Sequence, residues 1–126
     1  MLAYHAGAAV ALVLSQLVIW HFAGAGYFWP EWVLLPVALV LAIHAWVELV
    51  VARVPAARPD TRAVAIHAGA AACLAVFLTA VWAVTDSGYF WPGWAILGLA
   101  IALGMHALVS SARKRTRRSC AIQLHN

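Results

Sequence analysis

The chain has 126 residues, of which 66% are hydrophobic and 10% are charged, and its formal net charge at pH 7 is +4. Soluble domains carry charge at about a quarter of their positions. This composition therefore excludes a protein whose surface is covered by water, and we expect lipid to surround most of the chain.

Four apolar stretches are each predicted to form one helix: residues 3–22, 31–52, 64–84 and 93–112. Each is close to the ~20 residues that a helix needs to cross a bilayer, and a helix satisfies its own backbone in lipid. The first stretch lacks the basic start and the small-residue cleavage site of a signal peptide, so it is interpreted as a retained helix. The predicted fold class is an all-α membrane protein with a bundle of four transmembrane helices.

Short turns join the first stretch to the second and the third to the fourth. Both turns contain Gly, and each ends in a proline, Pro30 or Pro92, which suits the first turn of a helix. Each pair of stretches is therefore a helical hairpin. The predicted organisation is a first hairpin over residues 1–53, a linker over 54–63, a second hairpin over 64–112 and a basic tail over 113–126.

The two hairpins are copies of one sequence unit. Three segments recur at an offset of 62 residues: GYFWP of 26–30 at 88–92, HAGAA of 5–9 at 67–71, and HA of 44–45 at 106–107. Because each unit has two helices, both units enter and leave the membrane on the same side. We expect parallel repeats that are related by a pseudo-twofold axis along the membrane normal.

All eight basic residues lie near the linker or in the tail, and neither turn carries one. The positive-inside rule therefore places the linker and both termini in the cytoplasm. Basic residues at a membrane exit contact anionic headgroups, so they are interpreted as lipid contacts rather than as a nucleic-acid site. The residues are Arg53, Arg58, Arg62, Arg113, Lys114, Arg115, Arg117 and Arg118.

Aromatic residues gather at the two turns. Trp and Tyr are enriched where helices meet the membrane–water interface, so we interpret both clusters as an aromatic belt on the non-cytoplasmic face. A ligand site for a quinone or a signal molecule is the alternative. The clusters are Trp20, Tyr27, Phe28, Trp29 and Trp32, and Trp82, Tyr89, Phe90, Trp91 and Trp94.

Each predicted helix carries one histidine of a repeated set: His5, His44, His67 and His106. At a rise of ~1.5 Å per residue, the two histidines of each hairpin lie at nearly the same depth. Ionisable side chains inside a membrane are rare, face the bundle interior and mark functional sites. We therefore predict a layer of four imidazoles, which are candidate metal ligands.

The leading hypothesis for this layer is a b-type haem, which takes two axial nitrogens on opposite faces of the porphyrin. Symmetry favours a pair that crosses the pseudo-twofold axis, either His5 with His67 or His44 with His106.

Three further residues are candidates for the cofactor pocket. Gly7 and Gly69 are expected to leave room for the macrocycle. Gln16 lies on the same helical stripe as His5 and is expected to hydrogen-bond either a ligand or a neighbouring helix.

Two other interpretations stay open. Imidazole also binds bare transition metals, and Glu48, one helical turn after His44, could add an oxygen ligand. Alternatively the histidines hold no cofactor and bond to each other or titrate, in a sensory or scaffold subunit of a membrane complex.

The sequence contains no Gly-rich phosphate loop, no paired carboxylates and no Ser–His–acid set, and Asp60 and Asp86 fall on opposite sides of the membrane. It therefore predicts no enzymatic activity other than a redox one. The leading functional hypothesis is a small haem protein for electron transfer or for haem or redox sensing.

The repeated motifs resemble the bacterial two-transmembrane (2TM) domain family. That family has a His in its first helix, matched by His5 and His67, and a second helix that begins with a Trp-Pro pair and a nearby Gly-Trp and closes with His-Ala. The second repeat matches this second helix with the segments 91–94 and 106–107 and with Gly98 between them. The first repeat matches it with Glu31 and Pro36 in place of Gly93 and Gly98.

The resemblance covers residues 3–112 and implies a tandem of two such domains in a bacterial cell (inner) membrane. It also implies similarity to membrane modules that are attached to sensor kinases. A sensor role for this chain would need a separate partner, in a homo-oligomer or a larger membrane complex.

Overall fold

The computed structural model describes residues 2–85 and 88–123, and over these residues it contains four helices and no strand. The helices are α1 (Leu2–Phe22), α2 (Glu31–Arg53), α3 (Pro59–Val84) and α4 (Pro92–Gln123). All four are long and apolar enough to cross a membrane. The predicted all-α fold of four membrane-spanning helices is confirmed. Asp86 and the last three residues of the predicted tail lie outside the described residues.

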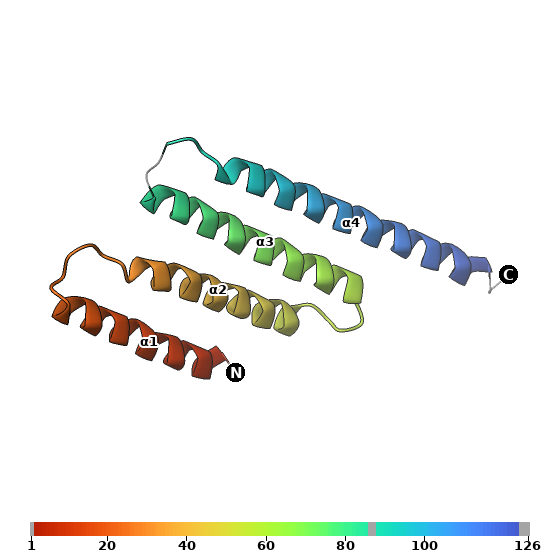
Figure 1. Ribbon diagram of the computed structural model, residues 1–126. Helices are drawn as coiled ribbons and strands as arrows, with labels where there is room; N and C mark the ends of the chain where they lie inside the picture. Colours follow the sequence, from red (N-terminus) through yellow and green to blue (C-terminus); the bar gives the residue numbers. More distant parts are fainter. Residues whose placement is uncertain (1, 86–87, 124–126) are drawn as a thin grey trace.

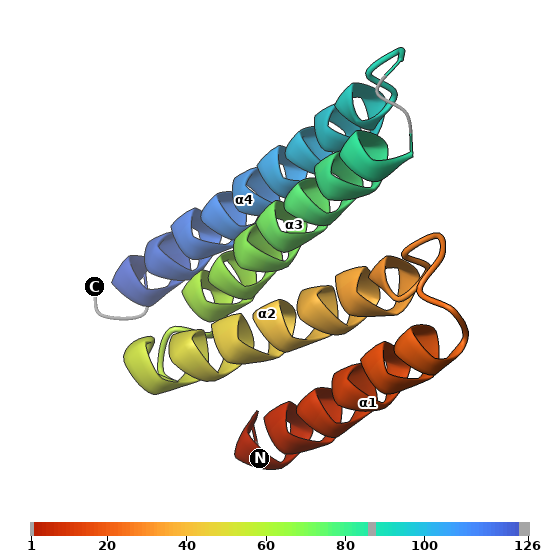
Figure 2. The same ribbon diagram turned by 90° about the vertical axis from the view of Figure 1, so that its left-hand side faces the viewer.

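The four helices lie side by side in chain order (Figure 1). α1 contacts α2, α2 contacts α3 and α3 contacts α4, whereas no contact joins α1 to α4 in the described part of the chain. The turns after α1 and α3 lie at one end of this row, the turn end. The α2–α3 connection and both ends of the described chain lie at the other, the linker end (Figures 1 and 2). The two hairpins are therefore parallel, as the repeat predicts.

Two helix boundaries differ from the prediction. α3 begins at Pro59 rather than at residue 64, because Pro suits a first helical turn and Asp60 places an acid near the positive end of the helix dipole. α4 continues to Gln123 rather than ending at residue 112. Its basic extension contains neither Gly nor Pro, and it is rich in Arg and Lys, which are good helix formers. In addition, Lys114 Nζ donates a hydrogen bond of 3.0 Å to Thr61 Oγ1 of α3. Residues 113–123 of the predicted basic tail therefore continue the last helix.

The two hairpins meet most closely at one point near the linker end. Trp46 of α2 lies on Gly69 of α3, and its Nε1 donates to the Ala65 carbonyl at 2.8 Å. A Cβ at Gly69 would overlap the indole ring, so only glycine allows this approach. We call the contact between the Trp46 side of α2 and the Gly69 side of α3 the hairpin junction.

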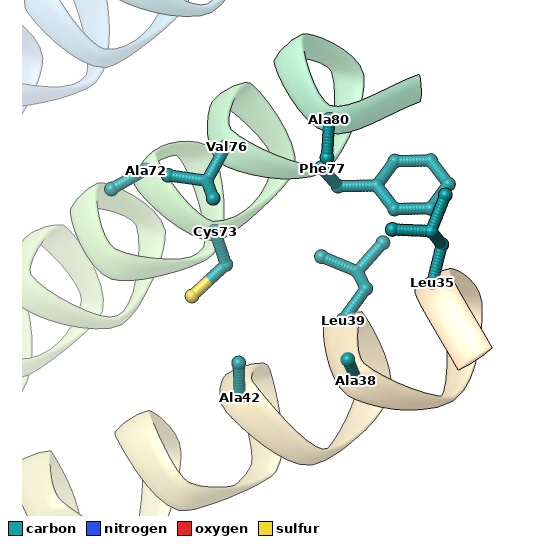
Figure 3. A pocket seen from close by; sticks show the side chains of 9 residues that line it. All are labelled: Leu35, Ala38, Leu39, Ala42, Ala72, Cys73, Val76, Phe77 and Ala80. Atoms are coloured by element: carbon teal, nitrogen blue, oxygen red, sulfur yellow. The ribbon is translucent and has the colours of Figure 1, made fainter. Parts of the chain in front are cut away.

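Towards the turn end α2 and α3 separate (Figure 2). An apolar cavity of about 340 Å³ lies between them there, and the Cys73 thiol points into it (Figure 3). Apart from the residues at the hairpin junction, few side chains are buried, and most large apolar side chains of the helices are exposed. A surface of this kind is suited to lipid and not to water.

Candidate functional site

The four candidate histidines meet as two pairs, each inside one hairpin. The ring centroids of His5 and His44 lie 4.7 Å apart, and those of His67 and His106 lie 5.0 Å apart. The expectation that pairs form across the pseudo-twofold axis is wrong. Because the helices lie in a row, α1 does not contact α3 and α2 does not contact α4, so each of these histidines meets the histidine of its own hairpin.

The second pair is joined by a hydrogen bond. His67 Nδ1 and His106 Nδ1 lie 3.0 Å apart, so one of these nitrogens must carry a proton and the other must accept it. His67 is exposed and His106 is half-buried. In lipid, this bond gives two polar rings a partner that the surroundings cannot supply.

The first pair has a carboxylate beside it. Glu48 lies one turn after His44, and its Oε1 is 3.4 Å from His44 Nε2. The same oxygen accepts a hydrogen bond of 3.2 Å from the Leu2 N–H in the first turn of α1, where helical N–H groups lack partners. The residue equivalent to Glu48 in the second hairpin is Ser110, which is buried. The two histidine pairs therefore differ in their surroundings.

The facing nitrogens of the second pair lie closer together than two axial ligands of one metal do. Metal–imidazole bonds measure about 2.0–2.1 Å, so two axial nitrogens on opposite faces of a metal lie about 4 Å apart. The His67 and His106 Nδ1 atoms are 3.0 Å apart, so these two nitrogens bond to each other in this arrangement.

The three residues expected to line a cofactor pocket lie in different surroundings. The space beside Gly69 is filled by the Trp46 indole, whereas no atom lies within 4 Å of a Cβ placed at Gly7. Gln16 is half-buried on α1, the helix that contacts α2 alone in the described part of the chain. Gly69 thus serves helix packing, and Gly7 faces the open side of α1.

The candidate metal ligands do not form a group of three. Within residues 2–85 and 88–123, no three His, Cys, Asp or Glu side chains surround a point that could hold a metal ion. Glu48 lies beside His44 but does not complete such a group with His5. Each hairpin therefore offers two imidazoles.

The first tryptophan of each hairpin packs on the turn that follows it. Trp20 lies edge-on to Phe28 with ring centroids 5.1 Å apart, and its repeat equivalent Trp82 lies edge-on to Phe90 at 4.9 Å. Trp20 Nε1 also donates to the carbonyl of Tyr27 at 3.2 Å. The equivalent Trp82 Nε1 is buried and finds no hydrogen-bond partner among the described residues. Both aromatic clusters lie at the turn end, as the belt interpretation requires.

Tyr27 makes contacts that the second turn does not fully repeat. Its Oη donates to Glu31 Oε1 at 2.6 Å and accepts from Trp32 Nε1 at 2.8 Å. In the second turn Trp94 Nε1 donates to Tyr89 Oη, but Gly93 replaces the glutamate. The hydrogen bond to the Glu31 carboxylate raises the pKa of the Tyr27 phenol above its ordinary value of 10.0, and the Trp32 contact opposes this in part.

Alkaline titration tests this contact. In a chain with Tyr4→Phe and Tyr89→Phe, we expect the remaining phenol to ionise above pH 10.0, and Glu31→Gln to lower its pKa. Because the folded-state pKa is raised, the contact stabilises the turn below pH 10 and is lost as the pH rises through the higher value. The ultraviolet absorbance of the phenolate reports the titration. An unchanged pKa after Glu31→Gln would contradict the assignment.

Comparison of the chain with protein-family models, with curated proteins and with solved structures gives no match.

Proposed function

We propose that the chain is a cofactor-free sensory or scaffold subunit of a membrane complex, in which the histidine pairs hold each hairpin together. The observation that carries this proposal is the 3.0 Å bond between His67 and His106. Polar side chains that bond across helices are a common way to join helices in lipid. The proposal agrees with the resemblance to the 2TM domains found beside sensor kinases.

The proposed location is the bacterial cell membrane, with the linker end in the cytoplasm. The support is the charge pattern: the basic residues lie around the α2–α3 connection and in the basic extension of α4, and both segments lie at the linker end (Figure 1). Cytoplasmic segments beside membrane spans carry an excess of Lys and Arg. Tags on the termini and a probe in the turn at residues 23–30 would report this orientation by their accessibility in intact cells.

The leading hypothesis from the sequence is that the histidines bind haem b, and an absorption spectrum of the purified protein tests it. We expect no Soret band, with or without dithionite, in protein made in cells that are supplied with haem. The informative variants are His67→Leu, His106→Leu and, as a control at the turn end of α1, His21→Leu. A Soret band that the first two changes abolish and His21→Leu leaves intact would overturn the proposal in favour of a haem protein.

A transition metal is the second candidate function, and the nitrogen spacing of the second pair favours it over haem. Two imidazoles on one tetrahedral ion lie about 3.3 Å apart for bonds of 2.0–2.1 Å, close to the 3.0 Å observed. Elemental analysis after purification without chelator decides between the two proposals. We expect no stoichiometric metal. One ion per hairpin would establish the metal site instead, if His67→Leu removes the ion of the second hairpin and Glu48→Gln weakens that of the first.

A further inference from the structure

The hairpin junction uses one stripe of side chains from each helix. The α2 stripe is centred on Trp46 and the α3 stripe on Gly69. Helical spacing and the cavity lining place the following residues along the two stripes: Leu35, Leu39, Ala42, Trp46 and Val50 on α2, and Ala65, Gly69, Ala72, Val76 and Ala80 on α3.

The repeat carries both stripes to the outer helices. At the offset of 62 residues, the α2 stripe corresponds to Leu97, Ile101, Gly104, Leu108 and Ala112 of α4. The α3 stripe corresponds to Ala3, Gly7, Val10, Leu14 and Val18 of α1. All ten of these residues are exposed. We call them the α4 edge and the α1 edge.

The α4 edge is more exposed than the side of α4 that faces α3. The residues of α4 that face α3 are half-buried or buried, as Leu99, Leu103 and Ser110 illustrate. Leu108 on the α4 edge is 65% exposed although its repeat equivalent, Trp46, fills the hairpin junction. The outer edges are therefore the repeat equivalents of the two sides of the hairpin junction, with Leu108 in place of Trp46, and within the described residues no hairpin of the same chain lies against them.

We propose that the α4 edge of one copy packs on the α1 edge of a second copy, in the way that α2 packs on α3 within the chain. Leu108 then lies over Gly7 as Trp46 lies over Gly69. Gly7 suits this role because small residues let membrane helices approach closely, and no atom of its own chain lies within 4 Å of a Cβ there. This inference rests on the proposed role as a subunit of a membrane complex, but not on the histidines.

Two copies can form this contact when both have the same orientation in the membrane. α4 and α1 run in opposite directions, as α2 and α3 do (Figure 1). When copies join through two different surfaces, they form a closed ring if the rotation between successive copies allows it, and otherwise a filament. A pair of copies with a twofold axis along the membrane normal would close both free edges with two such contacts.

Cysteine crosslinking in native membranes tests the proposed contact. Both native cysteines are first removed by Cys73→Ser and Cys120→Ser. One chain then carries Gly7→Cys and the other Leu108→Cys, with different tags, and the two are produced together and oxidised. We expect a product of twice the chain mass that carries both tags. Each chain alone should form little product, because the contact joins position 7 to position 108.

Val40→Cys is the matched control, since Val40 is 63% exposed, close to the 65% of Leu108, but lies on the inner helix α2. Paired with Gly7→Cys, it should give no crosslink. An equal yield from this pair would show random collision and overturn the proposal.

No mixed product would also overturn the proposal, and a chain with both Gly7→Cys and Leu108→Cys then identifies the other occupant. Crosslinking inside that chain would mean that α4 closes on its own α1; its absence would mean that neither its own α1 nor a second copy covers the α4 edge. These outcomes leave the haem and metal tests untouched, so the two proposals fail separately.

Discussion

Gly69→Ala is expected to separate the two hairpins, whereas Gly7→Ala, the same change at the equivalent place in the repeat, is expected to leave them together. A methyl group at Gly69 overlaps the Trp46 indole and would force it away from the Ala65 carbonyl. Overpacking of this kind costs about 1–3 kcal/mol. At Gly7 no atom lies within 4 Å, so the change can gain the roughly 1 kcal/mol by which Ala exceeds Gly in helices.

The measurement is the free energy of unfolding of each variant in the same detergent, followed by circular dichroism against denaturant concentration. A double-mutant cycle identifies the cause. Trp46→Leu gives the hairpin junction the leucine that Leu108 supplies on the α4 edge. We therefore expect Gly69→Ala to cost much less in that background. An undiminished cost there would mean that the overlap with Trp46 is not what makes glycine necessary.

Most of the fold could be predicted from the sequence because the signals are local. Four apolar stretches of membrane-spanning length, with Pro30 and Pro92 opening the second helix of each hairpin, predict α1 to α4 and their hairpins. The end of α4 could not be predicted in this way. Hydropathy falls at Arg113, where the basic run begins, but the backbone has no reason to leave the helix there, since charged residues such as Arg and Lys also favour helices.

The histidine pairs could be predicted only in part. Helical rise places His5 beside His44 and His67 beside His106 in depth, and the ring contacts confirm this. The partners could not be predicted, because they depend on whether the helices form a ring or a row. That arrangement depends on how the hairpins meet. The two repeats differ at this point, because Trp46 occupies the hairpin junction whereas the equivalent residue of the second repeat is Leu108.

Replacing one histidine of the second pair is expected to destabilise the protein more than replacing both. After His67→Leu, His106 keeps its polar ring in an apolar environment but loses the partner that lies 3.0 Å away. An unsatisfied buried polar group costs about 1–3 kcal/mol, whereas removing both partners together can be nearly neutral. We expect the cost of the single change to lie near the lower limit of this range, because polar groups of a chain unfolded in lipid also find partners.

The first pair provides the matched comparison for this experiment. After His5→Leu, His44 still has the Glu48 carboxylate 3.4 Å from its Nε2, so the single change should cost less than His67→Leu does. Free energies of unfolding for the single and double variants test both statements. Strictly additive costs in the second pair would show that the two imidazoles act independently.

A bonded pair would also explain why each histidine recurs with its partner. A single imidazole is unfavourable in lipid, but two that share a hydrogen bond join adjacent helices at one fixed depth. Duplication of the hairpin copies both partners together, and the two rings meet in each copy, with centroids 4.7 Å and 5.0 Å apart. The hairpin junction and the proposed contact between copies are then free to differ, as Trp46 and Leu108 do.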